Sequence, residues 1–193
     1  LDNSLDPPAA GSENHKKGVS GELWAVHGGG FYNPQKYLVA PKQLPEELHW
    51  FKWEAYATWI TGICLMTVVY YLNAGVYMVD PAVSDLTPLA AVGVGIGSLV
   101  AGWVFYDVVC RTPLLKRPAL MLMVMFGFLT AAAWGLTELL SARAAYIHVG
   151  AMIGTMMAGN VFFVIIPGQR KLVAAALEGR EPDAWPGIYA GLR

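Results

Sequence analysis

Four long apolar stretches are the feature that most restricts how this chain can fold. They lie near residues 55–75, 88–110, 119–140 and 144–167. A helix needs about 20 apolar residues to cross the hydrocarbon core of a bilayer, and each stretch reaches that length. Uninterrupted apolar runs also exclude the alternating pattern of a membrane β-barrel. The sequence therefore predicts an all-α integral membrane protein with a four-helix transmembrane bundle at residues 50–167.

The charged residues support this fold class and orient the bundle. Only 14% of the residues are charged, against about 25% in a typical soluble domain. Lysines precede the first apolar stretch and basic residues follow the last one, whereas the loop of residues 76–87 carries only Asp80 and Asp85. Basic segments stay on the cytoplasmic side of a membrane. We therefore predict that the long amino-terminal loop, residues 1–49, and the tail, residues 168–193, are both cytoplasmic.

Within the amino-terminal loop, the stretch WAVHGGGFY combines one histidine, three glycines and aromatic rings. A phosphate-binding loop would place a lysine and a helix start after the glycines, where Phe31 and Tyr32 stand. A plain turn would explain the glycines but not Trp24, His27 and Phe31 beside them. A wall of a pocket for a planar ligand would explain all of these residues.

Polar residues also flank the predicted bundle on its cytoplasmic side. His49, Lys52 and Glu54 stand where the first helix begins, and Gln169 and Arg170 follow Pro167 and Gly168, which we predict to end the fourth helix. An amide beside a guanidinium can pair with a flat, anionic, carbonyl-rich ligand. An ordinary basic flank of the membrane helices explains the same residues equally well.

The fourth apolar stretch carries the histidine that lies deepest in the predicted bundle, His148. It is either an axial ligand of a b-type haem or a side chain hydrogen-bonded to a neighbouring helix. Small residues spaced by four predict close helix packing, in the sets Gly150, Gly154, Ala158 and Gly93, Gly97, Ala101. We also expect Asp107 to pair with Arg111 along its helix, and Asn160 to bond to a neighbouring helix.

Several motifs resemble one known family. The stretches LDNSLDPP, GELWAVHGGGFY, HWFKWEAY and NVFFVIIPGQRKLV occur in order along the chain and are similar to the membrane-bound bacterial urate hydroxylases, whose membrane part is called the urate oxidase N-terminal domain. The resemblance implies eight membrane helices in the bacterial inner membrane, followed by a cytochrome c domain with a c-type haem. Against that pattern we expect this chain to be a fragment that lacks the first helix, the last helices and the cytochrome domain.

The resemblance also implies an activity, the conversion of urate to 5-hydroxyisourate with electrons passed to a cytochrome c. Under it we expect His27 and Glu54 to be catalytic and His148 to bind haem iron, with the second iron ligand on the family's similar first helix. By their chemistry, the expected urate-binding residues are Trp24, Phe31, His49, Lys52, Gln169 and Arg170. The expected partners are urate, a cytochrome c and the lipid bilayer, with no nucleic acid.

Two other function classes remain compatible with the residues. One is a cytochrome b-like electron-transfer subunit that does not act on urate. The other is a urate or purine transporter, since helices with broken ends can line a path across a membrane. The lack of charged residues deep in the four apolar stretches disfavours the transporter.

Overall fold

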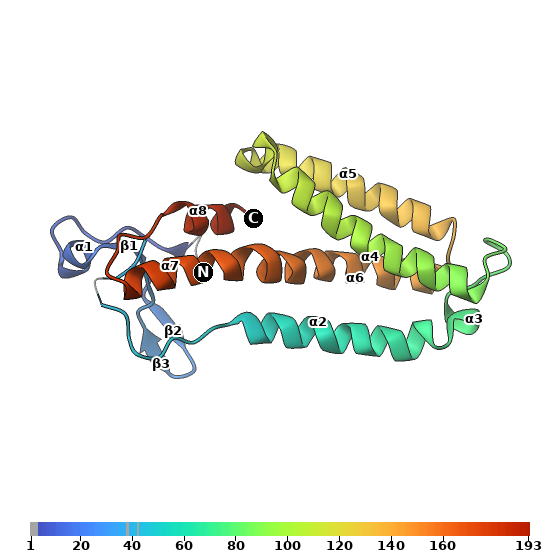
Figure 1. Cartoon of the computed structure of the whole chain (residues 1–193), viewed down its shortest axis with the longest axis horizontal. Helices are drawn as coiled ribbons and strands as arrows, with labels where there is room; N and C mark the ends of the chain where they lie inside the picture. The colour runs from blue at the N-terminus through green and yellow to red at the C-terminus, as the bar shows by residue number, and fades with distance from the viewer. Residues whose placement is uncertain (1–3, 38, 42) are drawn as a thin grey trace. The chain divides into compact units, whose positions relative to one another are not determined.

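The computed structural model describes residues 4–37, 39–41 and 43–193, and it is mostly helical, at 64%. The chain divides into two compact units (Figure 1). One contains Leu1–His49 and Ile165–Gly191, and the other contains Trp50–Val164 and Leu192–Arg193. The two units are described separately because each has its own internal packing.

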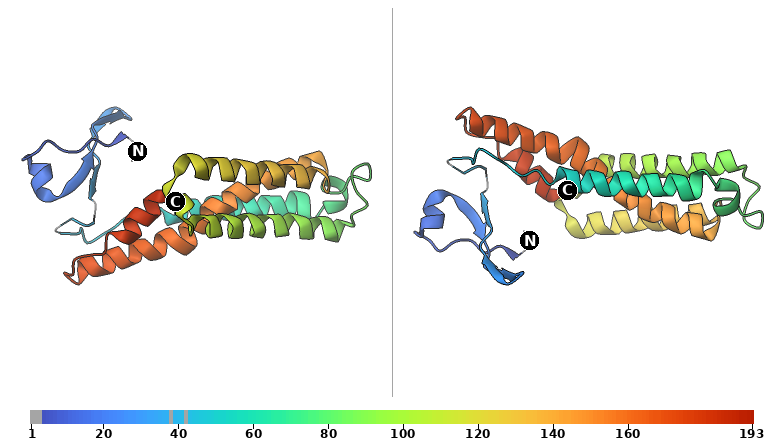
Figure 2. Two further views of the ribbon diagram at one scale, coloured as in Figure 1. Left: turned by 90° about the horizontal axis from the view of Figure 1, so that it is seen from above. Right: turned by 90° about the horizontal axis from the view of Figure 1, so that it is seen from below.

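The second unit is a helical bundle in which consecutive long helices run in opposite directions (Figure 1). Its elements are α2 (Lys52–Met66), the π-helical turn η2 (Thr67–Tyr71), α3 (Ala74–Tyr77), α4 (Pro88–Cys110), the 3₁₀ turn η3 (Pro113–Lys116), α5 (Pro118–Thr137) and α6 (Ala142–Asn160). The long helices α2, α4, α5 and α6 run lengthwise beside one another in both views of Figure 2. Helix α6 is the centre of this bundle, because it contacts each of the other three.

Local sequence signals set where these helices start. The Thr87 hydroxyl accepts a hydrogen bond from the Ala90 N–H at 3.3 Å, and Pro88 occupies the first turn of α4. The Ser141 hydroxyl caps α6 in the same way through the Ala144 N–H. Such caps satisfy backbone donors that a helix start leaves without partners, and proline is favoured there because it has no N–H to satisfy.

Three of the described helices are long and apolar enough to cross a membrane. These are Pro88–Cys110, Pro118–Thr137 and the 36-residue run Ala142–Leu177, which agree with the second, third and fourth apolar stretches. The first expected span, near residues 55–75, is instead a 15-residue α-helix followed by the π turn η2 and the short α3. The predicted count of four spanning helices is therefore not confirmed by helix length.

The fourth helix does not end at Pro167 and Gly168, and that prediction is wrong. The π turn η4 (Val161–Ile165) follows α6, and α7 (Ile166–Leu177) continues from it. Pro167 falls in the first turn of α7, where a helix tolerates the missing N–H. As a result Gln169 and Arg170 lie within a helix rather than after one.

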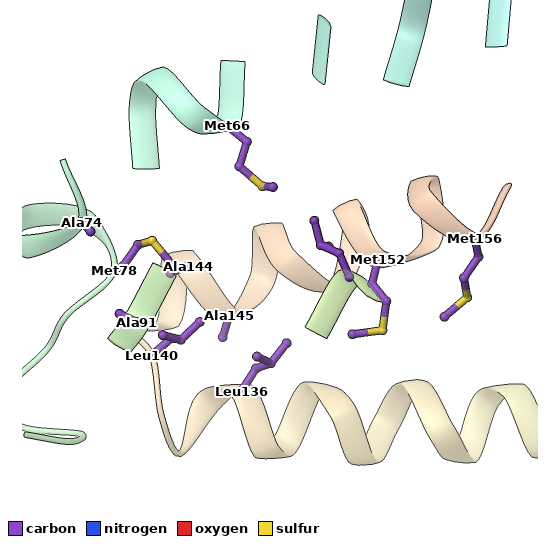
Figure 3. Packing of buried hydrophobic residues seen from close by; sticks show 11 residues of the cluster. Met66, Ala74, Met78, Ala91, Leu136, Leu140, Ala144, Ala145, Met152 and Met156 are labelled. Atoms are coloured by element: carbon purple, nitrogen blue, oxygen red, sulfur yellow. The ribbon is translucent and has the colours of Figure 1, made fainter. Parts of the chain in front are cut away.

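The core of the bundle is rich in methionine and alanine. Eleven buried apolar residues form one cluster, and Figure 3 shows Met66 of α2 and Leu136 of α5 directed towards α6 from its two sides. Many large apolar side chains lie on the outer faces instead, for example Leu65 on α2 and Leu122 and Phe126 on α5, which are exposed. This is the distribution expected of helices whose outer surface faces an apolar environment.

Helices α4 and α6 meet through glycines, but not the glycines predicted from spacing. A Cβ atom at Gly95 would collide with the His148 ring, and one at Gly102 would collide with Met152. At Gly93 and Gly97 a Cβ atom would meet no described atom within 4 Å. The stripe of Gly93, Gly97 and Ala101 is thus on the wrong face of α4, because four-residue spacing marks a face without showing which neighbour covers it.

The first unit contains short elements where a loop was expected. These are α1 (Glu13–Lys17), β1 (Val19–Glu22), β2 (Ala25–His27), β3 (Gly30–Tyr32), β4 (Gln35–Tyr37), α7, and α8 (Trp185–Leu192), whose last residue is assigned to the bundle. Strands β1 and β4 pair antiparallel, as do β2 and β3. The amino-terminal segment is therefore built on two small sheets rather than on irregular loop.

Candidate functional site

The glycine-rich stretch forms a β-hairpin. Strands β2 and β3 pair His27 with Gly30 and Val26 with Phe31, and Gly28 and Gly29 form the two-residue turn. Their φ angles are +56° and +80°. A type I′ hairpin turn requires positive φ at both positions, which glycine adopts without a steric penalty. The glycines are therefore explained by the turn itself.

The hairpin and the residue just before it present aromatic side chains to solvent. Trp24 is 71% exposed and Phe31 is 80% exposed. The His27 ring lies 6.5 Å from the Tyr32 ring, centroid to centroid, at a tilt of 56°. Rings this exposed do not close a pocket by themselves, but they are accessible to a flat ligand.

The other predicted site residues are divided between the two units. Gln169 and Arg170 lie exposed on α7, in the same unit as the hairpin and the exposed His49. Lys52 and Glu54 belong to the bundle, in the first turn of α2. The Lys52 ammonium lies 5.5 Å from the Trp50 ring centre and 5.4 Å from that of Trp53. This arrangement of amphipathic side chains is typical of a helix end at a membrane–water interface.

Glu54 lines one end of a large groove in the bundle. The groove has a volume of about 1400 Å³ and runs between α2 and α6, with the end of α5 contributing Ala133 and Thr137. Gly62, Gly150 and Gly154 lie along it, and a Cβ atom at any of them would meet no described atom within 4 Å. The Trp59 indole N–H crosses between the helices and donates to the Thr155 hydroxyl at 3.1 Å.

His148 is completely buried between α6, α4 and the π turn η2. Its Nδ1–H donates to the Ala144 carbonyl at 2.7 Å, and the Tyr71 hydroxyl donates to its Nε2 at 3.3 Å. An axial haem ligand must direct a free ring nitrogen at the iron. Here both nitrogens have partners and Nε2 lies against Gly95 of α4. The residues around His148 therefore do not fit a haem, contrary to our expectation.

No other metal centre is recognisable in the described part of the chain. No group of three or more His, Cys, Asp or Glu side chains there is placed to hold a metal ion. A b-type haem in this bundle stays a prediction, and its iron would need ligands other than His148.

A polar cluster at the opposite end of α4 was only half anticipated. Asp107 pairs with Arg111 at 2.7 Å, as predicted from their spacing. Its other oxygen pairs at 2.7 Å with Arg193, whose side chain is only 1% exposed. Arg193 also donates to the Asn160 side-chain oxygen at 3.2 Å, so Asn160 is bonded to the residue that follows α8 rather than to a neighbouring helix as expected.

The apolar surroundings of Asp107 and Asn160 signal that they need partners, but no local spacing identifies a residue 86 positions away as the partner. Removing one member of such a buried pair would leave a charge without compensation. The cluster therefore holds the bundle together around residue 193, rather than offering an open binding position.

A comparison with known protein families shows which family the chain belongs to. Its sequence matches the family described as Urate oxidase N-terminal over residues 1–193. The chain belongs to the Urate oxidase N-terminal family. The comparisons with curated proteins and with solved structures gave no match.

Membership in the Urate oxidase N-terminal family gives the chain a urate-related function and places it with oxidoreductases. The family membership predicted from the sequence motifs is thereby confirmed. The family match does not identify the residues that carry the chemistry. The candidate site is therefore defined by the positions and exposure of the residues described in this section.

Proposed function

We propose that this chain is the membrane part of a urate hydroxylase of the bacterial inner membrane. It would convert urate to 5-hydroxyisourate in purine catabolism and pass the electrons to a cytochrome c. The observation that carries this proposal is the family match over all 193 residues. The three long apolar helices support a location in a membrane, since a urate oxidase that acts in solution does not need them.

The exposed apolar surface of the bundle supports a place in the bilayer. Phe126 on α5 is 71% exposed and Leu122 is 70% exposed, although both belong to a helix long enough to span. In water such a surface would aggregate, whereas lipid would cover it. The basic residues flanking the bundle support a cytoplasmic position for the segments before and after it.

The first unit offers the chemistry that urate needs. Urate is flat, anionic and rich in carbonyl groups, so it can stack on an exposed ring such as Trp24 or Phe31. Arg170 and Gln169 are exposed on α7 and can pair with its polar edge. His49 is exposed in the same unit. These residues form the proposed substrate-binding set of the first unit.

The reaction requires a group that takes a proton from water. Urate gives up two electrons, water supplies the hydroxyl group at C5, and two protons are released. His27 is exposed on the hairpin, and we assign to its imidazole the role of general base towards the attacking water. Glu54 is a second acid–base candidate. The two electrons leave one at a time to cytochrome c, so each urate reduces two equivalents of this one-electron acceptor, by a path that does not use His148 as an iron ligand.

The test is urate turnover by membranes that contain the full-length parent protein, with cytochrome c as acceptor. Urate loss is followed by ultraviolet absorbance, and hydrogen peroxide is measured in parallel. We expect urate to disappear and cytochrome c to be reduced, without peroxide. Replacing His27 with Ala should lower kcat at least about 100-fold, which is the usual contribution of a general base.

His15 provides a matched control, because it is an exposed histidine in α1 of the same unit. His15→Ala should leave turnover unchanged. Unchanged turnover in His27→Ala would remove His27 from the mechanism. Intact membranes that take up labelled urate without altering it would instead identify a transporter, and a haem spectrum that does not respond to urate would identify an electron-transfer subunit.

A further inference from the structure

The hydrogen-bonded chain from Ala144 through His148 to Tyr71 has no role in the proposed urate chemistry. It lies in the bundle, near the start of α6 and the end of the π turn η2. Helix α2 and η2 together run 20 residues from Lys52 to Tyr71, which corresponds to about 30 Å of helix. The pair is therefore at the opposite end of α2 from Glu54.

The π turn determines where Tyr71 lies. The Leu72 N–H bonds to the Thr67 carbonyl at 2.9 Å, a bond that spans five residues instead of four. A π turn holds one residue more than an α-helical turn, so the side chains after it are rotated about the helix axis. At this position the rotation brings the Tyr71 ring to 5.8 Å from the His148 ring, centroid to centroid.

The backbone fixes which nitrogen of His148 can accept. A carbonyl oxygen cannot donate, so the bond to Ala144 requires the proton on Nδ1. The lone pair of a neutral imidazole is then on Nε2, which faces the Tyr71 hydroxyl. Each polar atom of the buried ring is thereby satisfied, which is the requirement for burying a histidine without charge.

Helix α4 closes the remaining side of the ring. Gly95 lies so near the His148 Nε2 that any Cβ atom at this position would collide with it. The Met78 side chain also reaches the Gly95 position, where a Cβ atom would lie 3.2 Å from its terminal methyl group. A porphyrin has no room on the Nε2 edge unless α4 and Tyr71 both move.

From this arrangement we propose that Tyr71 and His148 form a structural latch. The latch holds the π turn η2 against α6 and α4, and His148 is not a haem ligand. The proposal does not depend on the proposed urate activity, because none of its measurements is a turnover assay. Its failure would leave the urate proposal unaffected, and the reverse is also true.

The first test is the haem b content of the purified full-length protein, measured as the pyridine haemochrome. In His148→Gln the amide can still donate to Ala144 and accept from Tyr71. We expect the ratio of haem b to protein to equal that of the wild type, whether the wild type holds haem elsewhere or none. A loss of half or more of the haem b in folded His148→Gln protein would overturn the proposal.

The second test is a double-mutant cycle on thermal stability, which remains informative if a His148 variant folds poorly. Tyr71→Phe removes only the hydroxyl group and should lower the thermal midpoint by about 2–4 °C. Tyr70→Phe is the matched control on the same turn, since Tyr70 faces the groove, and it should shift the midpoint less. An unchanged midpoint in Tyr71→Phe would contradict the latch.

The cycle is completed by the double variant. The background for this cycle is His148→Leu, which offers Tyr71 no acceptor, so if the hydroxyl acts through His148, Tyr71→Phe should have less effect there than in the wild type. Fully additive effects of the two substitutions would show that the side chains act independently, and would also overturn the latch.

Discussion

The two faces of α6 carry side chains of different size and are packed in opposite ways. Towards α4, its large side chains His148, Met152 and Met156 are buried. Two of them fill the space left by Gly95 and Gly102 of the partner helix. Towards α2, its small residues Gly150 and Gly154 line an open groove. Close packing in this bundle thus comes from large side chains opposite glycines, not from glycine stripes facing each other.

This difference separates two uses of glycine. A glycine that receives a neighbouring side chain is required at its position, since any Cβ atom would collide with that neighbour. A glycine that faces open space contributes little to the packing of the described chain. Substitutions on the two faces should therefore differ strongly in their effect on stability.

The largest effect should come from filling the notch on α4. We expect Gly102→Val to destabilise the fold by about 3 kcal/mol, because the new side chain displaces Met152 from the α4–α6 contact. Thermal unfolding of the purified protein in detergent measures this loss. Gly97→Val, on the open face of the same helix, is the control and should unfold near the wild-type temperature. Similar losses in both variants would show that the two faces of α4 do not differ.

Emptying the same contact from the α6 side should have a comparable or smaller effect. Met152 is 2% exposed, and truncation to Ala leaves a cavity that we expect to cost about 2–3 kcal/mol, the lower part of the range for a buried methionine. Met157 on the same helix is 68% exposed, so Met157→Ala should change stability by less than about 0.5 kcal/mol. Denaturation curves of the two variants in one detergent decide the point. Equal midpoints would mean that the α4–α6 contact is not the stable part of the bundle.

Across the groove, the hydrogen bond between Trp59 and Thr155 should have a moderate effect. Trp59→Phe keeps an aromatic ring but removes the N–H donor, which we expect to cost about 1 kcal/mol. Thr155→Val removes the acceptor, and the pair can be tested as a double-mutant cycle. A coupling energy close to zero would show that α2 and α6 are held by their apolar contacts alone.

The smallest effect should follow a change in the groove lining. Gly154→Ala adds one methyl group where no described atom lies within 4 Å, and alanine favours a helix by about 1 kcal/mol over glycine. The thermal midpoint should therefore stay unchanged or rise. A clear fall would reveal that something closely packs against this face in the protein as isolated.

The helices long enough to span were predictable from sequence because hydropathy is a local property. The stretches at residues 88–110 and 119–140 correspond to α4 and α5 within a few residues. The hairpin turn at Gly28 and Gly29 could also have been predicted, since two glycines between short strand-like runs favour a type I′ turn. The pairing of Asp107 with Arg111 followed from helical spacing in the same way.

Features that depend on distant residues were not predictable. Spacing defined the stripes Gly93–Gly97 and Gly150–Gly154 correctly as helix faces, but it could not show that His148 and Met152 form the packed face instead. The partner of Asp107 at Arg193 and the continuation of the helix through Pro167 have no local signal of comparable strength. The roles of the candidate urate residues Trp24, His27 and Arg170 remain predictions, because those roles depend on contacts with a ligand.

The π turn η2 also makes the winding of the chain part of the contact between Tyr71 and His148. If Thr67–Tyr71 wound as an ordinary α-helix with no residue removed, every later side chain would be rotated by about 100° about the helix axis. Tyr71 would then point away from His148, although no residue in contact with the histidine had been replaced. The extra residue of the turn acts as a register shift stored in the chain, so this contact depends on how many residues the turn holds as well as on which residues they are.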